Sequence, residues 1–138
     1  MKKLFYIFIL LFIVGWAQAQ QRVVYTINDG WKFTKGSPFE AQLTGCDDSS
    51  WETVNIPHTW NDKDADDETP GFYRGPVWYR KQLFIDKSQE GRQAVIYFEG
   101  ANQEVRFYLN GQFVGEHKGG YTRFCFDITS HLRYGQEN

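Results

Sequence analysis

The chain has 138 residues and a formal net charge of −2 at pH 7, with only three histidines and two cysteines. A mildly acidic chain without a basic stripe is poorly suited to bind nucleic acid or an anionic membrane surface. Aromatic residues make up 18% of the sequence, and large rings fill the thin interior of a two-sheet protein. We therefore expect a β domain whose partners do not include nucleic acid.

The first residues have the layout of a secretory signal peptide. Lys2 and Lys3 precede an apolar run at 4–16, and a small-x-small cleavage site ends at Ala19. A membrane anchor is the alternative, but spanning a bilayer takes about 20 apolar residues and this run is shorter. We predict cleavage after Ala19, so that residues 20–138 form one exported domain, periplasmic or secreted, with no membrane attachment.

Export permits disulfides, and Cys46 and Cys125 are the only cysteines. Two cysteines cannot form the dense framework that would establish a pairing. A bridge between them stays open as one alternative. Free, half-buried thiols are the other, and we favour it.

Short β-like runs, separated by Gly, Pro, Asn and Asp, follow the signal segment. The first covers 22–27, and the run WKFT begins after the turn residues Asn-Asp-Gly at 28–30. The stretch 35–50 is polar and is expected to be a loop. A short strand at 51–56 must end at Pro57, because proline cannot donate to a β-ladder.

The second half of the chain carries the more regular strands. One strand is predicted at 77–86, and the runs 93–99 and 104–109 alternate apolar and polar side chains. Asn110-Gly111 follows, which is the strongest short-range signal of a hairpin because a type I′ turn needs positive φ at both positions. With a further strand at 122–127, about eight strands at this spacing predict a β-sandwich.

Residues 57–76 form a long loop, and a loop of that length in a compact domain is usually functional. Asp62 and Asp64 have the spacing of calcium ligands in an EF-hand. However, Asp67 stands where the EF-hand requires glycine, and Tyr73 stands where it requires glutamate. An EF-hand is therefore excluded, while a looser calcium or sodium site and a plain solvated loop stay open.

The same loop is our candidate for sugar binding. Trp60 stands at one end and the segment GFYRG, which contains Arg74, stands at the other. Aromatic faces beside carboxylates and an arginine can stack on a pyranose ring and bind its hydroxyls. His58, His117 and His131 lack the spacing of a metal set, and we expect His58 either to support a site residue from behind or to be hydrogen-bonded in the core.

Five segments in a fixed order resemble the N-terminal sugar-binding, jelly-roll domain of glycoside hydrolase family 2, the β-galactosidase and β-glucuronidase family. The PHTWN and YRG motifs are most similar to those of exported β-galactosidases of Bacteroides-type bacteria. The resemblance covers nearly all of the predicted mature chain. The segments are NDGWKF (28–33), WETVNIPHTWN (51–61), YRGPVWYRKQL (73–83), FEGANQEVRFYLNGQFVGEHKGGYTRFCFDIT (98–129) and GQEN (135–138).

The resemblance implies a galactose-binding-like jelly roll that is cut short at its C-terminal end. An immunoglobulin-like domain and a (β/α)₈ barrel would follow, with a retaining pair of glutamates about 5 Å apart in the barrel. This segment would therefore hold no catalytic residue, and Glu99, Glu104 and Glu116 would lie on or beside strands. Mg²⁺ or Na⁺ would act mostly outside this segment, which would itself need no cofactor.

The resemblance also implies that the loop after PHTWN reaches the terminal sugar of a β-galactoside or related glycan. The predicted contacts are Asn61, Asp62 and Asp64, beside Trp60 and Arg74. Glycines at 115, 119 and 120 are expected to let the chain turn tightly before the strand FCFDIT. A free-standing lectin-like β-sandwich and an adhesive sandwich without a sugar ligand are the alternatives to a glycosidase module.

Overall fold

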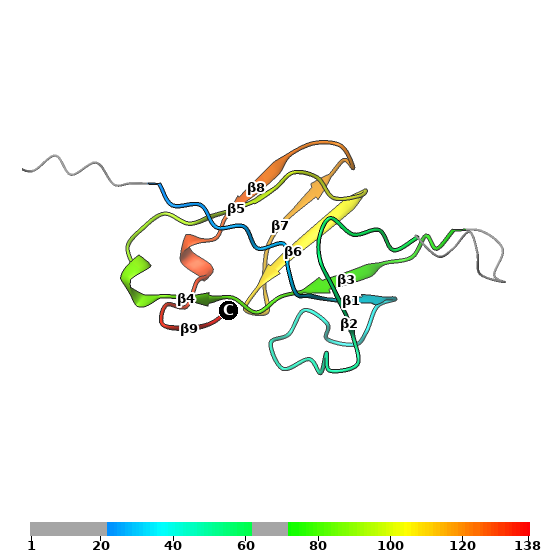
Figure 1. The fold of residues 1–138 in the computed structure, drawn as a ribbon, viewed down its shortest axis with the longest axis horizontal. Helices are drawn as coiled ribbons and strands as arrows, with labels where there is room; N and C mark the ends of the chain where they lie inside the picture. The colour runs from blue at the N-terminus through cyan, green and yellow to red at the C-terminus, as the bar shows by residue number, and fades with distance from the viewer. Residues whose placement is uncertain (1–21, 62–71) are drawn as a thin grey trace, which may run out of the picture.

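The computed structural model describes residues 22–61 and 72–138, and within these ranges the fold is all-β. Figure 1 shows the strands as an arrangement of small sheets joined by long connections. Two single 3₁₀ turns, η1 (Lys87–Gln89) and η2 (Thr129–His131), interrupt them. The strands are β1 (Trp31–Lys35), β2 (Glu52–Val54), β3 (Val77–Arg80), β4 (Phe84–Ile85), β5 (Val95–Phe98), β6 (Glu104–Leu109), β7 (Gln112–Lys118), β8 (Phe124–Asp127) and β9 (Gln136–Glu137).

The three-stranded sheet has the order β2-β1-β3 and is antiparallel throughout. Phe33 on β1 is buried and lies opposite Tyr79 on β3. Its ring also contacts the ring of His58 at a centroid distance of 4.7 Å. The alternation of β1 therefore turns one face of this sheet into a small aromatic core.

The remaining strands pair as β4–β9, β5–β8 and β6–β7, all antiparallel. The predicted hairpin is confirmed, since Asn110 and Gly111 join β6 to β7 with φ angles of 54° and 82°. The Asn110 side chain donates hydrogen bonds to the His131 carbonyl and to Asn138 Oδ1, at 2.8 and 3.0 Å. The turn is thus tied to the end of the described chain.

A cluster of phenylalanines joins the β5–β8 pair to the β6–β7 pair. Phe98 stacks on Phe124 at 4.9 Å, which lies beside it in the β5–β8 ladder. Phe107, from β6, stacks on Phe126 at 5.5 Å and meets Phe98 edge-on at 5.9 Å. Two ladders that face each other through interlocking rings form the two layers of a sandwich.

Gly115 has a different role from the predicted one. It lies within β7, where a β-bulge shifts the register beside Phe107, and not in a turn. A Cβ at this position would lie 2.6 Å from the ring of Phe126. The glycine is therefore needed because the ring of the opposite layer occupies the space of a side chain.

Two predicted strands differ from the structure. Residues 22–27 form no strand, because no described strand pairs with them, and 22–26 stay exposed, with Tyr25 71% exposed. The predicted strand at 77–86 divides into β3 and β4. The division arises because β3 pairs with β1 whereas β4 pairs with β9, so the chain changes sheets between them.

The core of the described residues is small. Seven apolar side chains are buried: Phe33, Ala41, Trp51, Val54, Leu109, Phe124 and Ile128. Cys46 and Cys125 are both free; Cys46 is half-buried as expected, but Cys125 is exposed. None of the helical turns in the described ranges is long and apolar enough to cross a bilayer.

Candidate functional site

The structure describes the two ends of the predicted sugar-binding loop. Trp60, Asn61 and Arg74 lie in these ends, whereas Asp62 and Asp64 lie outside the described residues. Trp60 Nε1 donates a hydrogen bond of 3.4 Å to the carbonyl of Tyr73, and Asn61 Nδ2 donates one of 3.5 Å to the same oxygen. Two adjacent side chains at the start of the loop are thus hydrogen-bonded to the backbone at its end.

Tyr73 anchors the base of this loop to the three-stranded sheet. Its hydroxyl donates to the Pro76 carbonyl at 2.8 Å and accepts from the Gly36 amide at 2.9 Å. The ammonium group of Lys35, at the end of β1, lies 5.3 Å from the centre of the Tyr73 ring. Arg74, the next residue, is exposed. The loop therefore starts and ends on a fixed base.

Asn61 carries an acceptor that lacks a donor in the described part of the chain. Its Oδ1 is buried and forms no hydrogen bond there. Exchanging the oxygen and nitrogen of this amide would set Oδ1 against the Tyr73 carbonyl, so the present orientation is the better one. An unsatisfied buried acceptor costs about 1–3 kcal/mol.

His58 is half-buried and hydrogen-bonded, packed against the small aromatic core of the three-stranded sheet. Its Nδ1 forms a hydrogen bond of 2.8 Å with the hydroxyl of Tyr79. Burial raises the pKa of Tyr79 to about 12. The Phe33, His58 and Tyr79 rings pack on one another, so this histidine supports the sheet behind the loop.

The loop 36–50 contains a second structured region, which the sequence did not predict. Arg80 on β3 pairs with Asp48 at 2.9 Å and donates to the carbonyls of Ala41 and Leu43 at 2.6 and 2.8 Å. One strand residue thus holds three points of a loop that lie 32 to 39 positions earlier in the chain. The polar composition of the loop is the only sequence signal, and it does not identify the partner.

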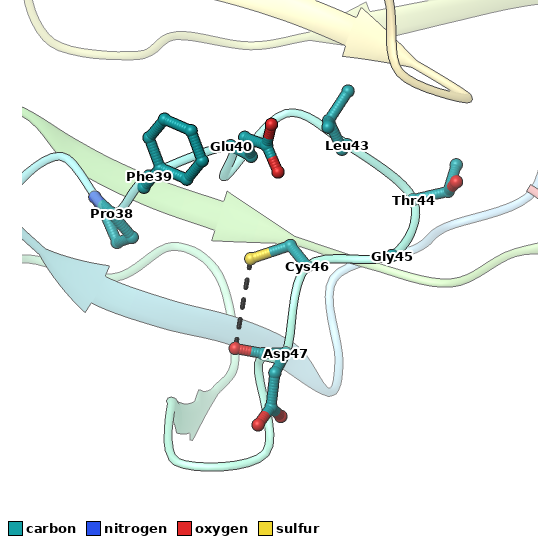
Figure 2. A pocket seen from close by; sticks show the side chains of 8 residues that line it. All are labelled: Pro38, Phe39, Glu40, Leu43, Thr44, Gly45, Cys46 and Asp47. Atoms are coloured by element: carbon teal, nitrogen blue, oxygen red, sulfur yellow. Dashed lines mark hydrogen bonds between the residues drawn. The ribbon is translucent and has the colours of Figure 1, made fainter.

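The loop encloses an open hollow, and Figure 2 shows the side chains that line it. The hollow has a volume of about 560 Å³. Hydrogen bonds from Ser49 lower the pKa of Asp47 at its rim, and the Cys46 thiol lies 3.9 Å from the Asp47 carbonyl. The lining residues are Pro38, Phe39, Glu40, Leu43, Thr44, Gly45, Cys46 and Asp47.

Three glutamates of the sandwich have no catalytic surroundings. Glu99 is exposed after β5. Glu104 lies 3.6 Å from Lys118, and Glu116 lies 3.8 Å from Arg106, in half-exposed surface pairs. The described residues also contain no group of three or more His, Cys, Asp or Glu side chains that could hold a metal ion. The notable chemistry in this part of the chain is hydrogen bonding and ring stacking.

Comparison with known proteins assigns the fold to a family. The profile for glycosyl hydrolases family 2, sugar binding domain, matches residues 15–138. A β-glucuronidase of Formosa agariphila is 39% identical over 128 residues, which are 87% of this chain and 13% of that protein. A β-galactosidase of Thermoanaerobacter pseudethanolicus is 38% identical over 114 residues, which are 83% of this chain and 15% of that protein.

Solved structures agree with this assignment. The crystal structure of a Bacteroides uniformis β-glucuronidase superposes with a TM-score of 0.79 at 39% identity, over 85% of this chain and 14% of that one. A putative β-galactosidase from Bacteroides fragilis gives a TM-score of 0.69 at 36% identity, over 83% of this chain and 17% of that one. The chain spans less than a fifth of the length of these relatives. It belongs to glycoside hydrolase family 2 and contains the N-terminal sugar-binding β-sandwich of that family.

Proposed function

We propose that this chain is the sugar-binding domain of an exported glycosidase that removes terminal β-linked galactose or glucuronic acid. The observation that supports this most strongly is the family match over residues 15–138. The resemblance in the sequence favours a galactoside. The names of the relatives favour glucuronides as well, since both β-galactosidases and β-glucuronidases are among them.

In this proposal the whole protein hydrolyses the glycosidic bond with retention of configuration. One carboxyl group acts as acid and base, and a second, about 5 Å away, forms a covalent glycosyl intermediate that water then hydrolyses. A (β/α)₈ barrel, which would follow an immunoglobulin-like domain, would supply both groups. A requirement for Mg²⁺ or Na⁺ would also belong to that part of the protein.

The loop 57–76 would complete the sugar site from this domain. Trp60 and Asn61 are held together at its base through the Tyr73 carbonyl, and Arg74 is exposed beside them. Asn61 Oδ1 has no donor among the described residues but is buried, so in this proposal the loop must move to expose it to a sugar hydroxyl. Asp62 and Asp64 would add carboxylate acceptors from the same loop.

A panel of chromogenic aryl glycosides tests the activity on the full-length gene product. We expect hydrolysis of the β-galactoside or the β-glucuronide, and no hydrolysis of the matching α-glycosides. Proton NMR of the first-formed sugar should show the β-anomer. Binding of these sugars without hydrolysis of any β-glycoside would contradict the proposal and indicate a lectin.

Replacement of Asn61 tests the role of the loop. We expect Asn61→Ala to lower kcat/KM by about tenfold, equivalent to about 1.4 kcal/mol of transition-state binding. Gln112→Ala is the matched control, because this exposed amide lies on β7. Equal kcat/KM values for the two variants would exclude Asn61 from the sugar site.

Export is proposed from the signal-like residues 1–19. We expect the mature protein to begin at Gln20 and to be recovered from the periplasm or the medium. N-terminal sequencing of the fractionated protein measures this directly. A cytoplasmic protein that retains Lys2 and Lys3 would contradict export.

A further inference from the structure

The hollow in the loop 36–50 is held open by contacts from two sides. Arg80 binds the carbonyls of Ala41 and Leu43 from β3, and Ala41 is only 1% exposed. On the other side, Leu43 lies beside the hairpin turn, about 3.8 Å from where a Cβ of Gly111 would stand. A loop without regular structure therefore has a fixed backbone, as a preformed binding site requires.

One large ring stands at the rim of this hollow and is not used for packing. Phe39 is 88% exposed. Figure 2 shows Pro38 and Phe39 on one limb of the loop, across from Cys46 and Asp47 on the other. A rigid loop that displays a bare aromatic ring beside a hollow is typical of a surface that binds a ligand.

The polar groups around Phe39 determine which ligand fits. Glu40, Thr44 and Asp47 line the hollow, and no lysine, arginine or histidine does. Ser49 donates to the Asp47 carboxylate, with its amide 3.0 Å from Oδ1, and a carboxylate with about four lone-pair sites can accept a further donor. Two carboxylates and a hydroxyl attract hydroxyl donors and repel anions.

We infer that this hollow is a second carbohydrate-binding site, which takes a neutral hydroxyl-rich glycan and rejects uronic acid units. The Phe39 ring stacks on one pyranose face, while Glu40 and Asp47 accept hydrogen bonds from the sugar hydroxyls. The volume of about 560 Å³ lies within the range of roughly 300–1,000 Å³ typical of small-molecule sites. None of the lining residues belongs to the loop 57–76. The inference rests on the proposed function only in taking the ligand to be a carbohydrate.

Native electrophoresis of the full-length gene product in gels that contain a polysaccharide tests this site. One gel contains a neutral β-galactan and another contains a β-linked polyglucuronate. We expect retardation in the neutral gel only.

The variants test which side chains bind the glycan. Phe39→Ala should weaken the apparent affinity for the galactan at least about fivefold. Asp47→Asn should weaken it about twofold to fivefold, because the amide keeps only part of the acceptor capacity of the carboxylate. Phe84→Ala, which removes another exposed ring, is the matched control and should bind as the unsubstituted protein does.

The outcomes separate this inference from the proposed function. Aryl-glycoside hydrolysis by the unsubstituted protein is measured in parallel. Hydrolysis together with equal retardation of the Phe39→Ala and Phe84→Ala variants overturns the second site alone. Retardation that depends on Phe39 in a protein without hydrolysis overturns the proposed function alone. A lower melting temperature for Phe39→Ala with unchanged retardation would mean that another part of the protein covers this ring, and would also overturn the site.

Discussion

Two regions of the described structure, the paired ladders and the loop 36–50, are stabilised in different ways. The β5–β8 and β6–β7 ladders are held by a cluster of rings, in which Phe98, Phe107 and Phe124 come from three strands. The loop 36–50 contains no strand and is held mainly by one side chain, Arg80. The first region distributes its stability over many apolar contacts, whereas the second concentrates it in a few charge-assisted hydrogen bonds.

This difference predicts which substitutions should affect several strands and which should affect one loop only. Loss of one ring from the cluster removes packing that several strands share. Loss of Arg80 should release one loop and leave the ladders paired, because the loop carbonyls would lose their donors while the strands keep theirs. Five predictions follow from the contrast, in descending order of expected effect.

The largest effect is expected for Phe124→Ala in the ring cluster. Phe124 is buried and stacks on both Phe98 and His117. Its removal should cost about 3–4 kcal/mol of unfolding free energy, since it leaves a cavity as well as losing contacts. Pulse proteolysis in urea, read on peptides from residues 22–138 of the full-length protein, measures this cost. A loss below about 1 kcal/mol would show that the cluster is not a shared core.

Arg80→Met should destabilise the loop by about 2–3 kcal/mol, because hydrogen bonds to a charged partner contribute about 1.5–3 kcal/mol each and water replaces part of them. Hydrogen exchange of amides in 36–50 should accelerate, while exchange in β6 and β7 stays unchanged. Arg106→Met is the control, since its ion pairs are exposed and 3.8 Å long and contribute little. Equal acceleration in both regions would break the proposed contrast.

Gly115→Ala tests how tightly the two ladders are packed. The new Cβ would lie 2.6 Å from the Phe126 ring, so the layers must separate, at a cost of about 1–3 kcal/mol. Gly45→Ala is the control, because no atom lies within 4 Å of its Cβ position. The same proteolysis assay compares the two variants. Similar free energies of unfolding for the two variants would show that the ring cluster can shift to accommodate the extra methyl group.

A pH dependence of stability is expected for Tyr79, which lies on β3 in the three-stranded sheet. Its folded pKa is raised to about 12 by burial, while an unfolded tyrosine titrates near pH 10. The folded chain therefore holds this proton more tightly. Its contribution to the free energy of unfolding is fully present below pH 10 and is lost as the pH rises toward 12. Tyr79→Phe should reduce the loss of stability between pH 9 and pH 11.5. An identical pH profile for the variant would contradict a protonated, buried phenol.

The smallest expected effect is a gain in stability from Glu40→Gly in the loop. Glu40 has a φ of 57°, which costs a residue with a side chain about 1–2 kcal/mol. Glycine removes this strain but adds unfolded-state entropy, so a net gain of about 0.5 kcal/mol is expected. Glu90→Gly is the control, because its φ of −58° is ordinary and glycine should destabilise there. Thermal proteolysis of residues 22–138 compares the two.

Short-range signals in the sequence predicted much of the fold. The Asn110-Gly111 hairpin and the strand 104–109 are confirmed, because turn geometry and alternation depend only on neighbouring residues. The run 22–27 has the same β-like composition and yet forms no strand. A strand needs a partner as well as a pattern, and composition does not reveal whether a partner exists.

The candidate sites show the same division. Trp60 and Asn61 were predicted as sugar contacts. The structure places both on the carbonyl of Tyr73, and their contact with sugar stays a prediction. Asp62 and Asp64 stay predictions, since they lie outside the described residues. The hollow at 36–50 was missed, because its frame depends on Arg80, a residue 30 or more positions away from each of its partners.

The sequence by itself thus determined the β class, the hairpin and the family, since each depends on local patterns and sequence motifs. Only the tertiary structure decided why Gly115 lacks a side chain, which residue holds the loop 36–50, and that Phe39 stands bare beside a hollow. These features arise when distant segments come within a few ångströms of each other. Contacts of that range follow from the packing of the whole domain, which a linear pattern does not encode position by position.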